Sequence, residues 1–271
     1  MSCKKKNPVN CLVTLFALVT WLSIGLFLPA EKLLADNLPK SPFSALSVKE
    51  TGFEQKTGKS DSARQQQNLI FKVGNVSFEM VFVGGGTFSL GVTDQENVTL
   101  SSYYIGRTEV TQDLWEAVMG SNPSFFKGGQ RPVEHVSWED CQIFIHKLNS
   151  LLGKNFRLPA EVEWEYAARG GHHTHGYKYA GSDDLGTVAW YGNNSGGKTH
   201  NVGTREPNEL GIYDMSGNVG EWCEDCSGNC QVFRGGGWSH YARYCNVSYR
   251  HYNISDYHYY YLGLRLVLSD L

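Results

Sequence analysis

The last forty residues, from Val232 to Leu271, place the strongest constraint on what this chain can fold into. Eight of its fifteen tyrosines fall between Tyr241 and Tyr261, interleaved with histidine, asparagine, serine and aspartate. Such polar residues do not suit a dry core, whereas tyrosine, serine and asparagine are enriched on adaptable binding surfaces. Glycine-rich and apolar stretches, at 235–237 and 262–267, flank the segment. The sequence therefore predicts a stiff frame that presents a chemically mixed face.

The aromatic and polar members of this segment are its candidate ligand-binding residues. They are Trp238, Ser239, His240, Tyr241, Tyr244, Asn246, Ser248, Tyr249, His251, Tyr252, Asn253, Asp256, Tyr257, His258, Tyr259, Tyr260 and Tyr261. Cys245, Val247 and Arg250 are expected to belong to the scaffold instead. An ordinary aromatic core is the alternative interpretation of the tyrosines. Side chains alternate between the two faces of an extended segment, so the consecutive tyrosines 259–261 cannot all point inward.

Length and charge limit the possible partners. A chain of 271 residues has room for one medium domain plus extensions. The net charge of −3 and the pI of about 6.3 provide no global basic field, so we expect no nucleic-acid partner. The expected partner of the segment is an external protein or glycan.

The N-terminal part indicates export. Three lysines, 4–6, precede an apolar run at 11–29, which is the pattern of a signal peptide or of an N-terminal membrane anchor over residues 1–35. Residues 36–67 are too polar to bury a core and are predicted to form a disordered tether. The folded domain is expected at 68–271, in the periplasm or at the cell surface, with membrane association only through the N-terminal segment.

Periodicity and capping residues predict the regular elements of this domain. Strands are expected at 78–83, 103–106, 231–233 and 264–268, where apolar and β-branched or aromatic residues gather. Helices are expected at 111–120, 137–153 and 159–170. The first two begin at Thr111 and Ser137, the third begins at Pro159, and each helix ends at a glycine.

Several longer motifs occur in order along the domain. They are FVGGGTF at 82–88, TEVT at 108–111, RLPAEVEWEYA at 157–167, GIYDMSGNVGEW at 211–222 and RGGGW at 234–238. Through these motifs the chain resembles the sulfatase-modifying-factor, or formylglycine-generating-enzyme, domain. The resemblance implies that family's α+β, C-type-lectin-like fold, which is loop-rich and has little regular secondary structure.

The enzymes of this family bind copper through two cysteines spaced Cys-x4-Cys after a Gly-Gly-Ser element. Here Cys245 matches the second cysteine, His240 stands at the first, and Gly237 replaces the serine. Paired thiolates are what Cu(I) prefers, so this substitution makes copper an improbable cofactor. A copper- or iron-dependent oxidase acting on a peptide cysteine or small thiol, with Cys245 and His240 as its metal ligands, is the alternative function.

A second resemblance accounts better for the C-terminal segment. The variable proteins of diversity-generating retroelements use the same domain and end in a Gly-Gly-Ser-Trp frame, a Tyr, Asn, His, Ser and Asp patchwork, and a Leu-Gly-Phe-Arg element. Here the frame is Gly235 to Trp238 and Leu262 to Arg265, with Gly237 and Leu264 for the usual serine and phenylalanine. The resemblance implies a non-enzymatic receptor or adhesin with residues 232–271 as its variable ligand-binding region.

The family resemblance also implies a structural calcium ion. The motif places the carboxylates of Asp214 and Glu221 and the backbone carbonyls of Gly217 and Val219 as its oxygen ligands, the donor type that calcium prefers. The alternative is that both carboxylates only accept hydrogen bonds from loop amides. Four cysteines, Cys223, Cys226, Cys230 and Cys245, favour disulfides in an exported protein over a zinc site.

Overall fold

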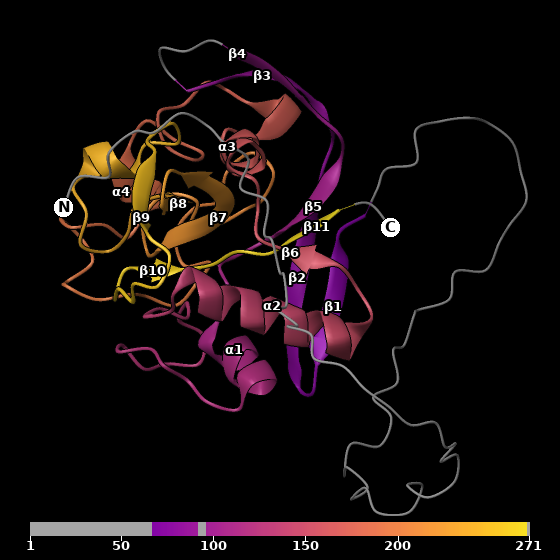
Figure 1. Ribbon diagram of the computed structural model, residues 1–271. Helices are drawn as coiled ribbons and strands as arrows, with labels where there is room; N and C mark the ends of the chain where they lie inside the picture. Colours follow the sequence, from indigo (N-terminus) through magenta and orange to yellow (C-terminus); the bar gives the residue numbers. More distant parts are fainter. Residues whose placement is uncertain (1–66, 92–95, 270–271) are drawn as a thin grey trace, which may run out of the picture. The chain divides into compact units, whose positions relative to one another are not determined.

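A computed structural model describes residues 67–91 and 96–269 (Figure 1). The predicted leader or anchor at 1–35 and nearly all of the predicted tether at 36–67 lie outside the described residues. Within the described ranges, no helix is both long enough and apolar enough to cross a membrane.

One antiparallel sheet contains both ends of the domain. Its strands are β1 (Leu69–Val73), β2 (Val76–Val83), β5 (Tyr103–Gly106), β11 (Val267–Ser269) and β6 (Phe156–Arg157). They lie in the order β1-β2-β5-β11-β6, so the C-terminal strand is an inner strand between β5 and β6. The strands predicted at 78–83 and 103–106 are confirmed as parts of β2 and β5.

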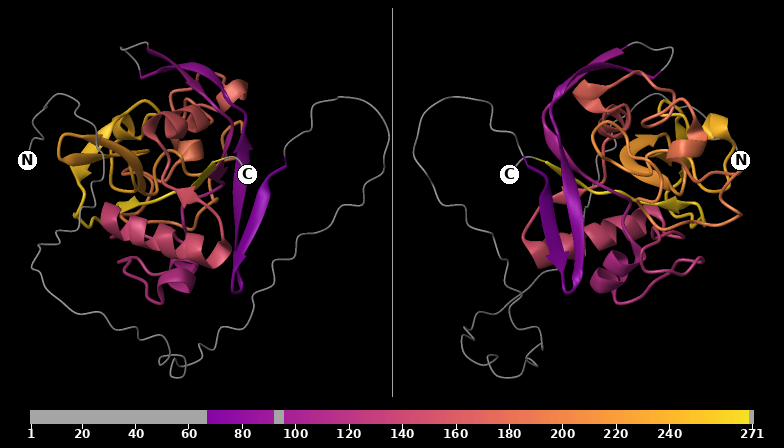
Figure 2. Two further views of the ribbon diagram at one scale, coloured as in Figure 1. Left: turned by 45° about the vertical axis from the view of Figure 1, so that its right-hand side comes forward. Right: turned by 180° about the vertical axis from the view of Figure 1, so that it is seen from behind.

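A second sheet carries part of the tyrosine-rich segment. It has the order β10-β7-β8-β9, and its strands are β10 (Leu262–Gly263), β7 (Gly220–Ser227), β8 (Cys230–Arg234) and β9 (His251–Ile254). A separate ribbon pairs β3 (Gly86–Leu90) with β4 (Glu96–Leu100). The hairpin β1–β2 and the pair β8–β9 lie on opposite sides of the domain in every view (Figure 2).

The first two helices follow their capping residues. In α1 (Gln112–Met119) the Thr111 hydroxyl accepts the N–H of Leu114, and in α2 (Trp138–Leu152) Ser137 and Asp140 form the predicted capping box. Gly120 and Gly153 end these helices in the left-handed conformation that favours glycine. The other helical elements of the described residues are α3 (Glu161–Ala168), α4 (Leu185–Val188), η1 (Gly171–His173) and η2 (Ala242–Cys245).

The start predicted for the third helix was wrong by two residues. It begins at Glu161 rather than Pro159, because the Glu163 carboxylate accepts the N–H of Ala160 at 2.8 Å and makes that residue the cap. Of the strand predicted at 264–268, only residues 267–268 are strand, as part of β11. β10 ends at Gly263 and β11 begins at Val267, and the chain between them places Arg265 in the interior.

Alternating residues of the first sheet supply two cores. Met80, Tyr104 and Leu268 face the cluster completed by α1 and α2. Their neighbours Val81 and Tyr103 face the cluster built with α3, β7 and β8. Side chains of successive strand residues point to opposite faces, which explains the division. Both clusters support the tyrosine-rich segment, the first through Tyr259 and Tyr261 and the second through Val247.

Candidate ligand-binding site

Both ends of the segment 238–261 are fixed to the same loop, residues 214–221. At the start, the N–H of Gly217 donates to the carbonyl of Gly235 at 2.9 Å, and the N–H of Trp238 donates to the carbonyl of Asn218 at 2.8 Å. At the end, the N–H of Gly220 donates to the carbonyl of Tyr261 at 2.6 Å. β10 then continues in parallel beside β7. The two flanking stretches that were predicted to frame the segment therefore bind to the same part of the chain.

Gly236 allows the segment to fold back onto its own frame. Its φ is +70°, and a Cβ there would lie 2.8 Å from the carbonyl oxygen of Tyr244 and 2.9 Å from the Sγ of Cys245. An L side chain would be strained in this conformation and would also collide with the segment. Glycine is thus required at position 236 because the backbone of the segment packs directly against it.

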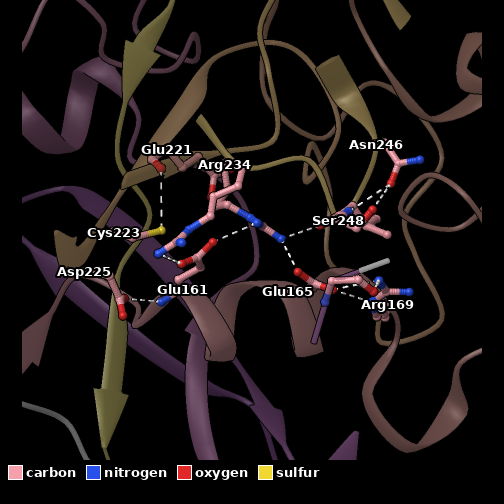
Figure 3. Close-up of polar contacts among 12 residues, drawn as sticks. Glu161, Glu165, Arg169, Glu221, Cys223, Asp225, Arg234, Asn246 and Ser248 are labelled. Carbon is pink, nitrogen blue, oxygen red and sulfur yellow. Dashed lines mark hydrogen bonds and ion pairs between the residues drawn. The ribbon is translucent and has the colours of Figure 1, made fainter. Parts of the chain in front are cut away.

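A buried arginine of β8 ties the middle of the segment to α3 (Figure 3). Arg234 pairs with the carboxylates of Glu161, at 2.9 Å, and Glu165. Its Nη2 also donates to the carbonyl of Val247 at 2.7 Å. Arg250 reaches the second oxygen of Glu161 at 2.5 Å from its more exposed position. The scaffold role predicted for Val247 and Arg250 therefore agrees with their contacts.

Buried and displayed residues alternate along this part of the segment. Cys245 and Val247 are buried, and Ser216 and Lys178 hold their backbones: the Ser216 hydroxyl donates to the Cys245 carbonyl at 2.9 Å, and the Val247 N–H donates to the Lys178 carbonyl at 3.1 Å. The candidate residues next to them in the chain, Tyr244, Asn246 and Ser248, are half-buried. The backbone is consequently fixed at positions different from those that carry the displayed side chains.

None of the candidate binding residues is buried. The exposed ones are Ser239, Tyr241, Tyr249, Tyr252, Asp256, Tyr257, His258 and Tyr260. The half-buried ones are Trp238, His240, Tyr244, Asn246, Ser248, His251, Asn253, Tyr259 and Tyr261. Tyr241 keeps 66% of its surface and Tyr260 keeps 45%, which is too much for core residues. The segment thus has the exposure that a ligand-contacting face requires.

The half-buried rings form one connected row. His240 lies edge-on to Tyr261 at 4.8 Å between ring centroids, and Tyr261 stacks on Tyr259 at 4.9 Å. His251 joins the row through His240, and stacks on the buried Phe233 at 4.5 Å. Burial lowers the pKa of His251 to about 4, so this ring is neutral near pH 7. The row is a platform beneath the more exposed rings.

Tyr260 points the other way and meets residues that sequence reasoning missed. Its ring stacks on His135 at 4.7 Å and lies 4.9 Å from Phe125. Phe126 in turn packs edge-on against Trp238 at 5.2 Å. The signal in the sequence was the pair Phe125-Phe126, two large aromatics in a loop rich in Asn, Pro, Ser and Gly. A second segment thus shares the face.

The loop 214–221 contains a buried charge cluster where calcium was predicted. Arg265 donates to both oxygens of Glu221, at 2.6 and 2.9 Å, and the Trp164 indole N–H also donates to Glu221, at 2.6 Å. Arg265 further donates to the carbonyls of Gly106 and Tyr213, each at 2.8 Å. Both carboxylate oxygens of Glu221 are therefore already bonded, and a positive charge already stands beside them.

Asp214 is less well satisfied than Glu221. Its Oδ2 accepts the N–H of Gly203 at 2.7 Å, while its buried Oδ1 has no hydrogen-bond partner within the described ranges. Burial raises the pKa of Asp214 to about 6, and burial with the nearby charge of Asp214 raises that of Glu109 well above its usual range. The calcium ion assigned to Asp214, Gly217, Val219 and Glu221 stays a prediction, with Arg265 as the built-in counter-charge.

Cys245 and His240, which stand at the copper-ligand positions of the family, differ in their chemistry from a pair of thiolates. Burial raises the pKa of the Cys245 thiol to about 12, so the thiolate that binds metal is scarce near pH 7. Its Sγ lies 3.9 Å from the carbonyl of Tyr241. His240 is held in the aromatic row. Cys223 and Cys245 are both buried free thiols, so neither takes part in the bridges expected among the four cysteines.

Comparison with known proteins establishes the family. The model of the sulfatase-modifying factor enzyme 1-like domain matches residues 66–270. The chain belongs to this family. The "Chaperone protein LppX" of Paenibacillus barcinonensis is a relative, 36% identical over 64% of this chain and 83% of its own length. The formylglycine-generating enzyme of Streptomyces coelicolor is 32% identical over 49% of this chain. The match covers 50% of that enzyme, so the chain spans about half of its length.

A solved structure of similar architecture confirms the fold of this sulfatase-modifying-factor domain. Treponema denticola variable protein 1 is 34% identical, superposes with a TM-score of 0.72, and is matched over 76% of this chain and 100% of its own. The C-type-lectin-like α+β class predicted from the motifs is therefore confirmed, as is the resemblance to the variable proteins.

Proposed function

We propose that the chain is an exported, non-enzymatic protein that binds an external protein or glycan ligand through the face formed by residues 238–261. The observation that carries the proposal is the separation of roles within the segment. Its displayed residues are exposed or half-buried, while Cys245 and Val247 are buried and Arg234 holds the backbone. Displayed side chains can therefore change without loss of the backbone contacts that Arg234, Ser216 and Lys178 make with the segment.

The composition of the face suits binding. Tyr241, Tyr249 and Tyr252 offer exposed rings and hydroxyls, and such residues often dominate the binding energy of interfaces. Histidine, asparagine and serine neighbours supply directional hydrogen bonds. Similarity to a protein named as variable supports the interpretation of 232–271 as a region in which these residues vary.

Binding by this face is testable with the purified full chain, a phage-displayed library of random linear peptides and a glycan array. We expect at least one of these collections to yield ligands that bind the native chain and lose about tenfold or more in affinity when Tyr241, Tyr249 and Tyr252 are replaced together by serine. Because the three side chains are exposed, the melting temperature should change little. Ligands that bind the triple variant equally well, or no ligand at all, would contradict the proposal.

Variation itself has a genomic test. We expect a near-copy of the coding sequence for 232–271 close to the gene, differing from it only at adenines and accompanied by a reverse transcriptase. If the flanking DNA contains neither, the variable-region part of the proposal fails, while binding by the face is still judged by the ligand screen.

The second candidate is the metal-dependent oxidase that the similarity to formylglycine-generating enzymes suggests. Ligand chemistry disfavours it, since one thiol of raised pKa and one imidazole replace the paired thiolates that Cu(I) prefers. Titration of the reduced chain with Cu(I) decides between the two. Stoichiometric, tight binding that is lost in Cys245→Ser would favour the oxidase; weak binding that this variant leaves unchanged favours the receptor.

A further inference from the structure

The loop 121–131 displays a large apolar side chain that packing does not explain. Phe125 keeps 63% of its surface exposed, although its neighbour Phe126 packs against Trp238. Scattered exposed apolar residues are common, but Phe125 lies directly beside the exposed ring of Tyr260. The two rings thus form a continuous apolar patch at the edge of the tyrosine-rich face.

A buried glutamine fixes the shape of this loop. The side-chain oxygen of Gln112 accepts the side-chain N–H of Asn122 at 2.9 Å and the backbone N–H of Gly128 at 3.0 Å. Its amide nitrogen donates to the carbonyl of Phe126 at 2.8 Å. Gln112 itself is fully buried in α1. The side chain of Gln112 therefore fixes the loop at Asn122, Phe126 and Gly128.

A buried carboxylate adds a second attachment. Glu134 accepts the backbone N–H of Phe126 at 2.8 Å, and the Ser124 hydroxyl accepts the N–H of Glu134 at 3.1 Å. Lys127 closes the loop by donating to the carbonyl of Asn122 at 2.7 Å. A ligand that binds Phe125 would consequently not have to order the loop first, which lowers the entropic cost of binding.

Polar groups around the patch are used within the protein. The indole N–H of Trp238 donates to the carbonyl of Tyr260 at 2.7 Å, and the Nε2 of His258 pairs with Asp140 at 2.7 Å. The indole N–H of Trp238 and the Nε2 of His258 are therefore not free to bind the hydroxyls of a glycan. An apolar side chain needs only the exposed area that Phe125 and Tyr260 offer.

We infer that Phe125 and Tyr260 form an apolar anchor site that takes an aliphatic or aromatic side chain of a protein partner. This inference rests on the proposed binding face and specifies its partner class. Phe125 lies outside the predicted variable region, so the anchor combines one constant ring with one ring of the segment. Versions of the face that differ at Tyr260 would share only Phe125.

The test uses the peptides selected on the full native chain. We expect their consensus to contain an aliphatic or aromatic residue, and their affinity to fall about tenfold or more in Phe125→Ser and in Tyr260→Ser. The matched control is Ile70→Ser, because Ile70 is 75% exposed in β1 on the opposite side of the domain. This control should bind the peptides like the native chain. Melting curves of all three variants establish that they are folded.

Each other outcome counts against the anchor site. Peptides whose binding depends on Tyr241, Tyr249 and Tyr252 but not on Phe125 would overturn the anchor and leave the binding face intact. If the native chain binds glycans on the array and Phe125→Ser does not, the assignment to a protein side chain is overturned. Peptides that resist both sets of substitutions would overturn the anchor and the binding face together.

Discussion

Replacing Arg234 by methionine should destabilise the domain that supports the tyrosine-rich segment. The arginine is only 1% exposed, and it pairs with Glu161 and Glu165, which are 4% and 0% exposed. Removal of one partner of a buried ion pair costs about 3–5 kcal/mol, because the remaining charge stays in the interior. Each carboxylate retains another arginine, Arg250 or Arg169, so the lower end of that range applies.

A loss of about 3 kcal/mol in a domain of this size lowers the melting temperature by roughly 6–12 °C. Thermal unfolding followed by circular dichroism, together with urea unfolding, measures the change. Arg250→Met is the matched control: it removes a guanidinium from the same Glu161, but that side chain is 41% exposed. Exposed pairs contribute about 1 kcal/mol or less. If Arg234→Met costs no more than Arg250→Met, the reasoning about the buried support is refuted.

The remaining predictions concern calcium and pH. Chelation of calcium should lower the melting temperature, because a cation bound to Asp214 and Glu221 would stabilise the folded state by mass action; an unchanged melting temperature would contradict the predicted calcium ion. Since burial lowers the pKa of His251 to about 4, its neutral form contributes stability that is complete above about pH 6.5 and is lost as the pH falls toward 4. Urea unfolding of the native chain and of His251→Phe at several pH values should therefore show that their unfolding free energies differ by an amount that changes with pH, by at most about 3 kcal/mol. If the two free energies change with pH in parallel, His251 does not have a lowered pKa.

Local signals in the sequence were sufficient for much of the fold. Thr111 and Ser137 cap their helices, and Gly120 and Gly153 end them, because these effects depend only on neighbouring residues. The third helix showed the limit of such signals. Pro159 suits a first helical position, but the Glu163 carboxylate competes by capping at Ala160. Its buried glutamates Glu161 and Glu165 could not be foreseen either, since they are compensated by the distant Arg234.

The composition of the C-terminal segment predicted its exposure correctly, including the alternation of Tyr259, Tyr260 and Tyr261. The contribution of Phe125 and His135 escaped prediction, because they meet Tyr260 from a loop more than a hundred positions away in the chain. The role of Arg265 beside Glu221 escaped for the same reason. Charge compensation in an interior depends on which residues the tertiary fold brings together.

The inner position of β11 makes the first sheet depend on residues that follow the tyrosine-rich segment. The chain reaches this strand only after the tyrosine-rich segment has been translated, and β11 then fills the gap between β5 and β6. A stop codon or frameshift within the segment removes this strand and leaves the first sheet divided. Only a chain that includes the C-terminal strand can complete the first sheet, so β5 and β6 would each lose a neighbour in a chain truncated within the segment.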